Sequence, residues 1–359
     1  MITTPTLFID KIKCKENINN MLSKANRHNV ELRPHFKTHQ SLEIGSWFKD
    51  VGVKKITVSS VTMAEYFSNQ WNDITIAFPT NILEIDPINQ LAKKITLNLS
   101  IENEESILFL CKHLKFKINV FLKIDVGYHR TGIAPTNFNL IDNILNKIKD
   151  NALIHFAGFL GHAGHTYTCR SKHDIIKIHK DSLDIMNTLK QKYRAKYPNV
   201  IVSLGDTPSC SVAETFSGVN EIRPGNFVFY DLTQNLIGSN LISQIAVAVA
   251  CPIVAIHENR SEIVIYGGGV HLSKDRINDK DGLVFGRLAK RLERGWGDVI
   301  PNTYIKSLSQ EHGIITAPKG EIKNYKIGDY VIILPVHSCM TSNLMKSYFT
   351  FDGQEISRL

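Results

Sequence analysis

Lys37 is the residue whose type and surroundings most directly suggest chemistry. It lies in the segment Arg33-Pro34-His35-Phe36-Lys37-Thr38-His39, after an apolar-polar alternation at residues 30–32 that predicts a short strand. A lysine at the C-terminal end of that strand, desolvated and flanked by His35 and His39, loses part of its preference for the charged form. Its neutral amine can then form a Schiff base with an aldehyde. A surface lysine in a loop is the alternative for this segment taken alone.

Two glycine-containing loops further along the chain have the composition of a phosphate site. They are Gly205-Asp206-Thr207-Pro208-Ser209 and Pro224-Gly225-Asn226, each after a predicted strand. Glycine lets the backbone approach an anion, Thr207 offers a hydroxyl, and a following helix presents free N–H groups. Barrels of alternating strands and helices often hold phosphate after strands 7 and 8, and strand 8 neighbours strand 1. A phosphate within reach of Lys37 predicts pyridoxal phosphate; ordinary turns are the alternative for each loop alone.

His337 and Cys339 are candidate metal ligands near the C-terminus. If residues 331–339 are extended, the i, i+2 spacing puts the imidazole and the thiol on one face of a strand. Histidine with thiolate suits Zn²⁺ better than Mg²⁺ or Ca²⁺, and two protein ligands leave positions open for water and substrate. A buried thiol near a histidine is the alternative for this pair alone.

Predicted strands and helices alternate along the first two thirds of the chain. Eight strands at this cadence predict an α/β fold, a parallel (β/α)8 TIM-type barrel. After the strand before Lys37, the other seven are expected at 56–58, 74–77, 95–97, 120–124, 156–160, 200–204 and 221–223, and the helices at 11–27, 63–69, 83–93, 104–113, 138–149 and 173–193.

The pattern changes after residue 238, where short strands and turns rich in Gly, Asp and Asn predict a separate C-terminal β domain. We expect the barrel at 12–238 and the β domain at 239–359, with residues 1–11 as a candidate to join the β domain. The longest helix expected within the β domain is at 283–292.

Composition excludes several classes of protein. Hydrophobic residues make up 43% and charged residues 21% of the 359 residues, which is typical of a folded globular protein. The formal charge of +8 comes without a basic stripe or binding motif, so we expect no nucleic-acid partner. The longest apolar run, residues 245–256, is too short to span a bilayer, and six scattered cysteines suggest reduced thiols. These features predict a cytoplasmic protein without a membrane partner.

Seven ordered motifs run along nearly the whole chain, at 33–39, 125–132, 161–167, 205–208, 221–226, 310–313 and 335–339. In this order they resemble the eukaryotic-type D-serine dehydratase and D-threonine aldolase family. The resemblance implies an alanine-racemase-like barrel of fold type III, a C-terminal β domain, covalently bound pyridoxal phosphate and a divalent metal.

The resemblance also implies roles for single residues. Lys37 would bond covalently to the cofactor, Arg130 would lie near its phenolic oxygen, and Tyr167 would face cofactor and substrate. Arg223 would face the pyridine nitrogen, and because an arginine stays charged it would not readily give that nitrogen a proton. The residues implied to hold the phosphate are Thr207, Gly225 and Asn226.

The same resemblance makes His337 and Cys339 the metal ligands. Met340 departs from the proline expected after this cysteine, which affects the expected turn rather than the ligands. Glu311 and His312 are implied to lie close by, without an assigned role.

These observations predict a pyridoxal-phosphate- and metal-dependent lyase acting on a D-3-hydroxy amino acid, foremost D-serine dehydratase, with Zn²⁺ or another divalent metal and a homodimeric state implied by the family. D-threonine aldolase and a D-3-hydroxyaspartate dehydratase or aldolase are the alternatives on the same cofactor. Family members with aldolase activity tend to carry a carboxylate at the position of Cys339, which favours elimination. A non-catalytic pyridoxal-phosphate carrier is the alternative from another class, but such carriers lack a C-terminal β domain.

Overall fold

The structure is a computed structural model that describes residues 2–359, and it divides into two compact units. One unit comprises Asn19–Gly225 and Leu359; the other comprises the chain up to Ile18 and Asn226–Arg358. The expected domain ranges, 12–238 and 239–359, remain a prediction. They differ from the compact units in where residues 12–18 and 226–238 are placed.

The first unit is built on eight parallel strands, as predicted. Their order in the sheet is β2-β9-β8-β7-β6-β5-β4-β3. The two edges meet at a parallel bridge between His35 and Thr57, where Phe36 N–H donates to Thr57 O over 2.8 Å. This bridge closes the barrel next to Lys37. The strands are β2 (Glu31–Leu32), β3 (Ile56–Val58), β4 (Asp73–Pro79), β5 (Thr96–Ile101), β6 (Ile118–Ile124), β7 (Ile154–Gly161), β8 (Ile201–Leu204) and β9 (Glu221–Ile222).

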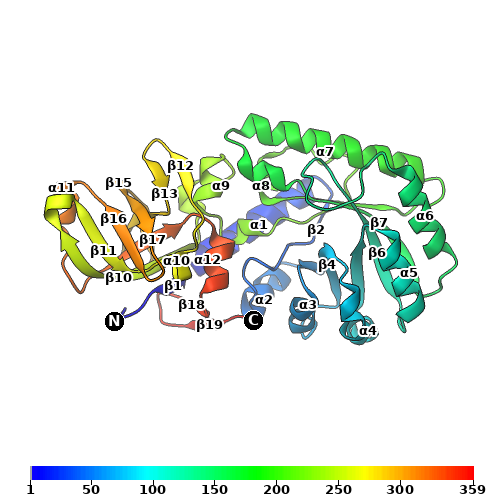
Figure 1. Cartoon of the computed structure of the whole chain (residues 1–359), viewed down its shortest axis with the longest axis horizontal. Coiled ribbons are helices and arrows are strands. Elements are labelled where there is room, and N and C mark those ends of the chain that lie inside the picture. The colour runs from blue at the N-terminus through cyan, green and yellow to red at the C-terminus, as the bar shows by residue number, and fades with distance from the viewer. Residues whose placement is uncertain (1) are drawn as a thin grey trace. The chain divides into compact units, whose positions relative to one another are not determined.

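Helices alternate with these strands, and α2–α7 run along the outside of the parallel sheet (Figure 1). Serine or asparagine caps most of their N-termini; Ser171 Oγ, for example, accepts from Asp174 N–H at the start of α7. Each helix turns its apolar stripe towards the strands. They are α1 (Lys11–Arg27), α2 (Leu42–Asp50), α3 (Val61–Phe67), α4 (Ile85–Lys94), α5 (Glu104–His113), α6 (Phe138–Lys149), α7 (Lys172–Tyr193) and α8 (Thr207–Val212), with 3-10 turns η1 (Ile82–Glu84) and η2 (Gly164–Thr168).

The second unit contains a nine-stranded sheet in the order β11-β16-β15-β14-β17-β10-β1-β18-β19. The N-terminal strand β1 pairs antiparallel with β10, from Thr6 opposite Ala250 to Ile9 opposite Val247. The strands of this unit are β1 (Thr6–Ile9), β10 (Val247–His257), β11 (Glu262–Tyr266), β12 (Ile277–Asp279), β13 (Gly282–Val284), β14 (Gly286–Arg291), β15 (Trp296–Leu308), β16 (His312–Thr316), β17 (Tyr330–Pro335), β18 (Ser347–Phe349) and β19 (Glu355–Ser357).

The helices of the second unit are all short. They connect the strands instead of forming a layer of their own over a long apolar stripe. They are α9 (Leu232–Leu236), α10 (Gly269–Leu272), α11 (Lys319–Ile322) and α12 (Ser338–Leu344), with 3-10 turns η3 (Asn226–Val228), η4 (Ile242–Gln244) and η5 (Glu258–Arg260).

The helix expected at 283–292 is wrong, because this segment forms β13 and β14. Its Leu, Ala, Lys and Arg residues favour a helix, but β14 lies between β15 and β17 and pairs antiparallel with both. A Cβ added at Gly286 would lie 2.7 Å from Ile333 Cγ2, so glycine permits this close approach of the strands. Sheet pairing has overridden helix propensity here.

Within residues 2–359, no helix has both the length and the apolar character required to cross a membrane.

Candidate active site

Lys37 lies just beyond the C-terminal end of β2, in the turn that follows the His35–Thr57 bridge. Its backbone N–H donates to His35 Nδ1 over 3.3 Å, so His35 is the predicted neighbour on one side. The expected desolvation is wrong, because the Lys37 side chain is exposed. His39, the neighbour on the other side, is buried, with its ring centroid 4.4 Å from that of Phe36.

Positive groups gather around Lys37 at this end of the barrel. Burial, with the charges of Lys37 and Arg223, lowers the pKa of His35 well below its usual value. Burial lowers the pKa of His162 to about 3, and Lys37 and Arg130 add to the effect although Gly205 O opposes it. Both imidazoles are therefore neutral at pH 7, beside several cations. Such a site suits a ligand that carries negative charge.

Lys123 also belongs to this cationic group, although it was not among the site residues expected from the sequence. It lies on β6, is 6% exposed and donates from Nζ to Ala77 O over 2.8 Å. Burial lowers its pKa to about 8, and Arg130 contributes further. The signal in the sequence was a lysine within an apolar strand, where the inward or outward direction of the side chain depends on the neighbouring strands.

Arg223 is held by a chain of buried hydrogen bonds within the barrel. Its guanidinium donates to Ser203 Oγ and, over 2.6 Å, to Gly161 O. Ser203 Oγ in turn donates to Glu221 Oε1 over 2.6 Å, and Glu221 Oε2 accepts from Arg33 Nε over 2.8 Å. Burial lowers the pKa of Arg223 to about 10, which still leaves it charged at pH 7.

The loops after β8 and β9 are joined at the predicted phosphate residues. Gly225 N–H donates to Thr207 Oγ1 over 3.2 Å, and Thr207 is 1% exposed. A Cβ added at Gly225 would lie 2.7 Å from His35 O, which is closer than real Cβ atoms come to a backbone oxygen. The loop after β9 thus packs directly against the loop that carries Lys37. This close backbone approach fits the cradle expected for a cofactor phosphate.

Arg130 and Tyr167 follow β6 and β7 respectively. The Arg130 guanidinium lies over the Tyr128 ring, 4.8 Å from its centroid, and its charge acts on His162 and Lys123. Tyr167 is half-buried in η2. Both residues therefore lie in loops that leave the same end of the barrel as Lys37.

His337 and Cys339 lie at the start of α12 in the second unit. The expected extended segment 331–339 is wrong, because β17 ends at Pro335 and α12 begins at Ser338. The two side chains still interact. Burial opposes protonation of His337, but Asp275 and the Cys339 sulfur outweigh it and raise its pKa to about 11. His337 Nδ1 lies 3.6 Å from Asp275 Oδ2.

An imidazole and a thiol in contact are a donor set that suits zinc. Among residues 2–359 there is no cluster of three or more His, Cys, Asp or Glu side chains arranged to hold a metal. Two protein ligands by themselves leave coordination positions for water and substrate.

Asn226, expected at the phosphate, directs its amide elsewhere. Its Nδ2 donates to Asp231 Oδ2 over 2.6 Å and to Ser338 Oγ over 2.9 Å, and it lies 3.6 Å from Cys339 Sγ. These hydrogen bonds tie the Asn226 side chain to the start of α12. Glu311 lies 3.8 Å from His271, and His312 begins β16; these positions assign no role to either residue.

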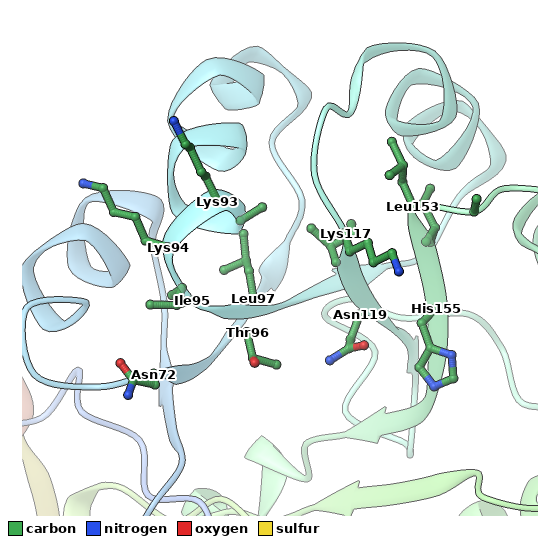
Figure 2. A pocket seen from close by; sticks show the side chains of 14 residues that line it. Asn72, Lys93, Lys94, Ile95, Thr96, Leu97, Lys117, Asn119, Leu153 and His155 are labelled. Carbon is green, nitrogen blue, oxygen red and sulfur yellow. The ribbon is translucent and has the colours of Figure 1, made fainter.

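A cavity of about 730 Å³ lies at the opposite, N-terminal end of strands β4–β7 (Figure 2). Its lining includes Lys93 and Lys94 at the end of α4, Lys117 before β6, and His155 at the start of β7. It contains no residue of the seven motifs. Catalytic groups of such barrels lie at the C-terminal ends of the strands, so we place the candidate site at the Lys37 end.

Two families match the chain. The alanine racemase N-terminal domain matches residues 9–232, and the "Putative serine dehydratase domain" matches residues 246–351. D-serine dehydratase of Dictyostelium discoideum is 29% identical, over 98% of this chain and 94% of that protein. D-threo-3-hydroxyaspartate dehydratase of Delftia sp. (strain HT23) is 25% identical, over 97% of this chain and 93% of that protein.

Solved structures agree with these sequence matches. The structure of the Delftia sp. HT23 enzyme superposes with a TM-score of 0.91 at 25% identity and covers 100% of this chain and 98% of its own. D-threonine aldolase from Filomicrobium marinum, at 19% identity, shares the fold with a TM-score of 0.85 over 99% of this chain and 95% of its own. The chain is thus a lyase that belongs to the alanine-racemase-like, fold type III pyridoxal-phosphate enzymes, in the family of D-serine dehydratases and D-threonine aldolases.

Proposed function

We propose that the protein is a zinc-dependent D-serine dehydratase that converts D-serine to pyruvate and ammonia with pyridoxal phosphate. The observation that carries this proposal is the contact between an imidazole and a thiol at the start of α12, in a chain whose barrel presents Lys37 among cationic groups. Similarity to the Dictyostelium enzyme over nearly the whole of both chains supports the choice of substrate.

The residues at the Lys37 end of the barrel fit the cofactor. Lys37 would bond to it covalently, and Thr207 and Gly225 would hold its phosphate where the backbone comes close to His35. Arg130 would lie near its phenolic oxygen and Tyr167 would face cofactor and substrate. The phosphate role of Asn226 also remains a proposal, for its side-chain amide donates to Asp231 and Ser338.

When bound, pyridoxal phosphate would supply withdrawal of electrons from the substrate α-carbon, and zinc would supply polarisation of the β-hydroxyl. Lys37 would take the substrate α-proton on Nζ. Arg223 would face the ring nitrogen without giving it a proton, because the guanidinium keeps its own. His337 and Cys339 would hold the zinc. Loss of water from D-serine leaves an enamine, and its hydrolysis yields pyruvate and ammonia.

Two other reactions remain candidates on the same residues. Similarity to the Delftia enzyme supports elimination from D-threo-3-hydroxyaspartate. A D-threonine aldolase would need a base for the β-hydroxyl proton, and Cys339 stands where aldolases of the family tend to carry a carboxylate. The non-catalytic carrier is disfavoured because residues 246–351 match a family of their own beyond the barrel.

We further propose that the enzyme is a cytoplasmic homodimer. All six cysteines are free thiols, which suits a reducing compartment, and the family resemblance implies the dimer. Light scattering of the purified protein measures the mass directly, and a mass of 40.5 kDa would contradict the dimer.

The deciding experiment offers the purified protein D-serine, D-threonine and D-threo-3-hydroxyaspartate separately. We expect pyruvate from D-serine with the highest kcat/KM, loss of that activity on chelation, and recovery with zinc. Glycine and acetaldehyde from D-threonine, with no pyruvate from D-serine, would replace the dehydratase by the aldolase. If oxaloacetate forms from D-threo-3-hydroxyaspartate with a higher kcat/KM than pyruvate from D-serine, the substrate is D-threo-3-hydroxyaspartate instead.

A further inference from the structure

Asp231 is a buried carboxylate next to the proposed metal ligands, and it is 1% exposed. Its Oδ1 accepts from Gln234 N–H over 2.9 Å and so caps α9. Its Oδ2 is not needed for that cap. No lysine or arginine of residues 2–359 forms an ion pair with Asp231.

The second oxygen of Asp231 is directed at Ser338, the residue between His337 and Cys339. It accepts from Ser338 N–H over 3.0 Å and from Ser338 Oγ over 3.2 Å. It also accepts from Asn226 Nδ2 over 2.6 Å, and that nitrogen lies 3.6 Å from Cys339 Sγ. Asp231 therefore holds the backbone between the two ligands directly, and the sulfur through Asn226.

The negative charge of Asp231 favours a cation at this site, because burial of a carboxylate is costly unless an opposite charge lies nearby. A divalent cation bound by His337 and Cys339 would supply that opposite charge. The N–H of Asn226 would meanwhile stabilise the thiolate form of Cys339, as hydrogen bonds to ligand atoms commonly do.

We propose that Asp231 is a positioning residue of the metal site. Through Ser338 and Asn226 it fixes the positions of His337 and Cys339, and its charge favours a bound cation. This inference rests on the assignment of these two residues as zinc ligands in the proposed function.

The test is the zinc affinity of full-length Asp231→Asn. Asparagine keeps the size of the side chain and can still cap α9, but its NH2 group replaces one acceptor oxygen and so disrupts the bonds to Ser338 or Asn226. Loss of an outer partner of a metal ligand typically weakens metal binding about 10- to 100-fold, so we expect at least a tenfold higher zinc Kd by competition with a chromophoric chelator. Pyridoxal-phosphate content should remain that of the wild type.

Asp10→Asn is the matched control. Asp10 also caps a helix, α1, since its Oδ1 accepts from Ile12 N–H over 3.1 Å and from Lys13 N–H over 3.0 Å. The Asp10→Asn protein should have the zinc Kd of the wild type, even if its thermal stability is lower. A purely structural role for Asp231 would lower the midpoint of thermal unfolding and leave the zinc Kd unchanged.

An unchanged zinc Kd in Asp231→Asn, with zinc bound normally by the wild type and lost in Cys339→Ala, would overturn this inference alone. If wild type and Cys339→Ala bind zinc equally, the metal assignment of the proposed function fails, and the role of Asp231 with it. Should Asp231→Asn not fold, Ser338→Ala decides, because it removes the hydroxyl that bonds to both Asp231 and Asn226. A zinc Kd raised in Ser338→Ala supports the role, and an unchanged one overturns it.

Discussion

Lys37 is the residue on which the proposed chemistry depends. Borohydride reduction of the yellow holoenzyme should fix the cofactor to the peptide that contains Lys37, and Lys37→Ala should lose turnover by at least about a thousandfold, because it removes both the covalent attachment and the α-proton acceptor. Peptide mapping by mass spectrometry checks the first result.

Lys55→Ala is the control for Lys37. Lys55 pairs with Glu31 over 2.8 Å at the start of the neighbouring strands, away from their C-terminal ends. It should retain cofactor and turnover. Fixation of the cofactor on a different lysine would remove the assignment of Lys37.

Lys123 provides a prediction about pH. Burial lowers the pKa of Lys123 to about 8 in the folded protein, against its ordinary value of 10.5, so the unfolded chain binds more protons between these pH values. Stability attributable to this residue should therefore rise with pH from 8 to 10.5, on the order of 3 kcal/mol in all. Lys123→Met should be more stable relative to wild type at pH 7 than at pH 10. Urea unfolding of the cofactor-free proteins measures the difference in unfolding free energy between Lys123→Met and wild type. A difference that does not change with pH would contradict the lowered pKa.

At the scale of the element, the start of α12 determines what can replace Cys339. Cys339 is the second residue of this helix, where an acidic side chain is compatible with the helix dipole. Cys339→Asp should therefore fold, yet it exchanges a soft ligand for a hard one. We expect weaker zinc binding, a relative gain for Mn²⁺ and loss of pyruvate formation. Undiminished zinc affinity in a folded variant would count against Cys339 as a ligand.

Strand β14 gives a second prediction at this scale, one of stability. Gly286→Ala should destabilise the second unit by about 1–3 kcal/mol, because the new Cβ would lie 2.7 Å from Ile333 Cγ2. Gly297→Ala is the matched control on β15, where the nearest atom to an added Cβ is 3.7 Å away. Thermal unfolding of both variants measures the contrast. Equal midpoints of thermal unfolding for the two variants would mean that β14 and β17 accommodate the added methyl group without loss of stability.

At the scale of the whole molecule, the two proposed ligand sites draw on different compact units. Lys37, Thr207 and Gly225 belong to the unit at 19–225, whereas His337 and Cys339 belong to the other. Chelation should therefore remove zinc and activity while the protein stays yellow, and zinc alone should restore turnover. Absorbance and metal analysis of the same sample check this. Loss of the cofactor together with the metal would show that the two sites are not independent.

Periodicity along the sequence by itself determined the barrel. The eight strands alternate with helices whose apolar positions recur at helical spacing, and these patterns persist because each element buries one face. The motif around Lys37 and the pair His337 and Cys339 were likewise recognisable from residue type and order. The glycine of the loop after β9 was predicted for close approach, and the structure shows that its neighbour is His35.

Tertiary structure alone decided where side chains point and which pairings form. His39 packs against Phe67, Lys123 donates to Ala77 O, and Asn226 donates to Ser338, and each of these partners is distant in sequence. Residues 283–292 became strands because sheet neighbours outweighed a local helix preference. Spacing suggested that His337 and Cys339 meet on a strand, whereas a helix start brings them together, because local periodicity does not contain the hydrogen bonds between distant segments that hold Ser338.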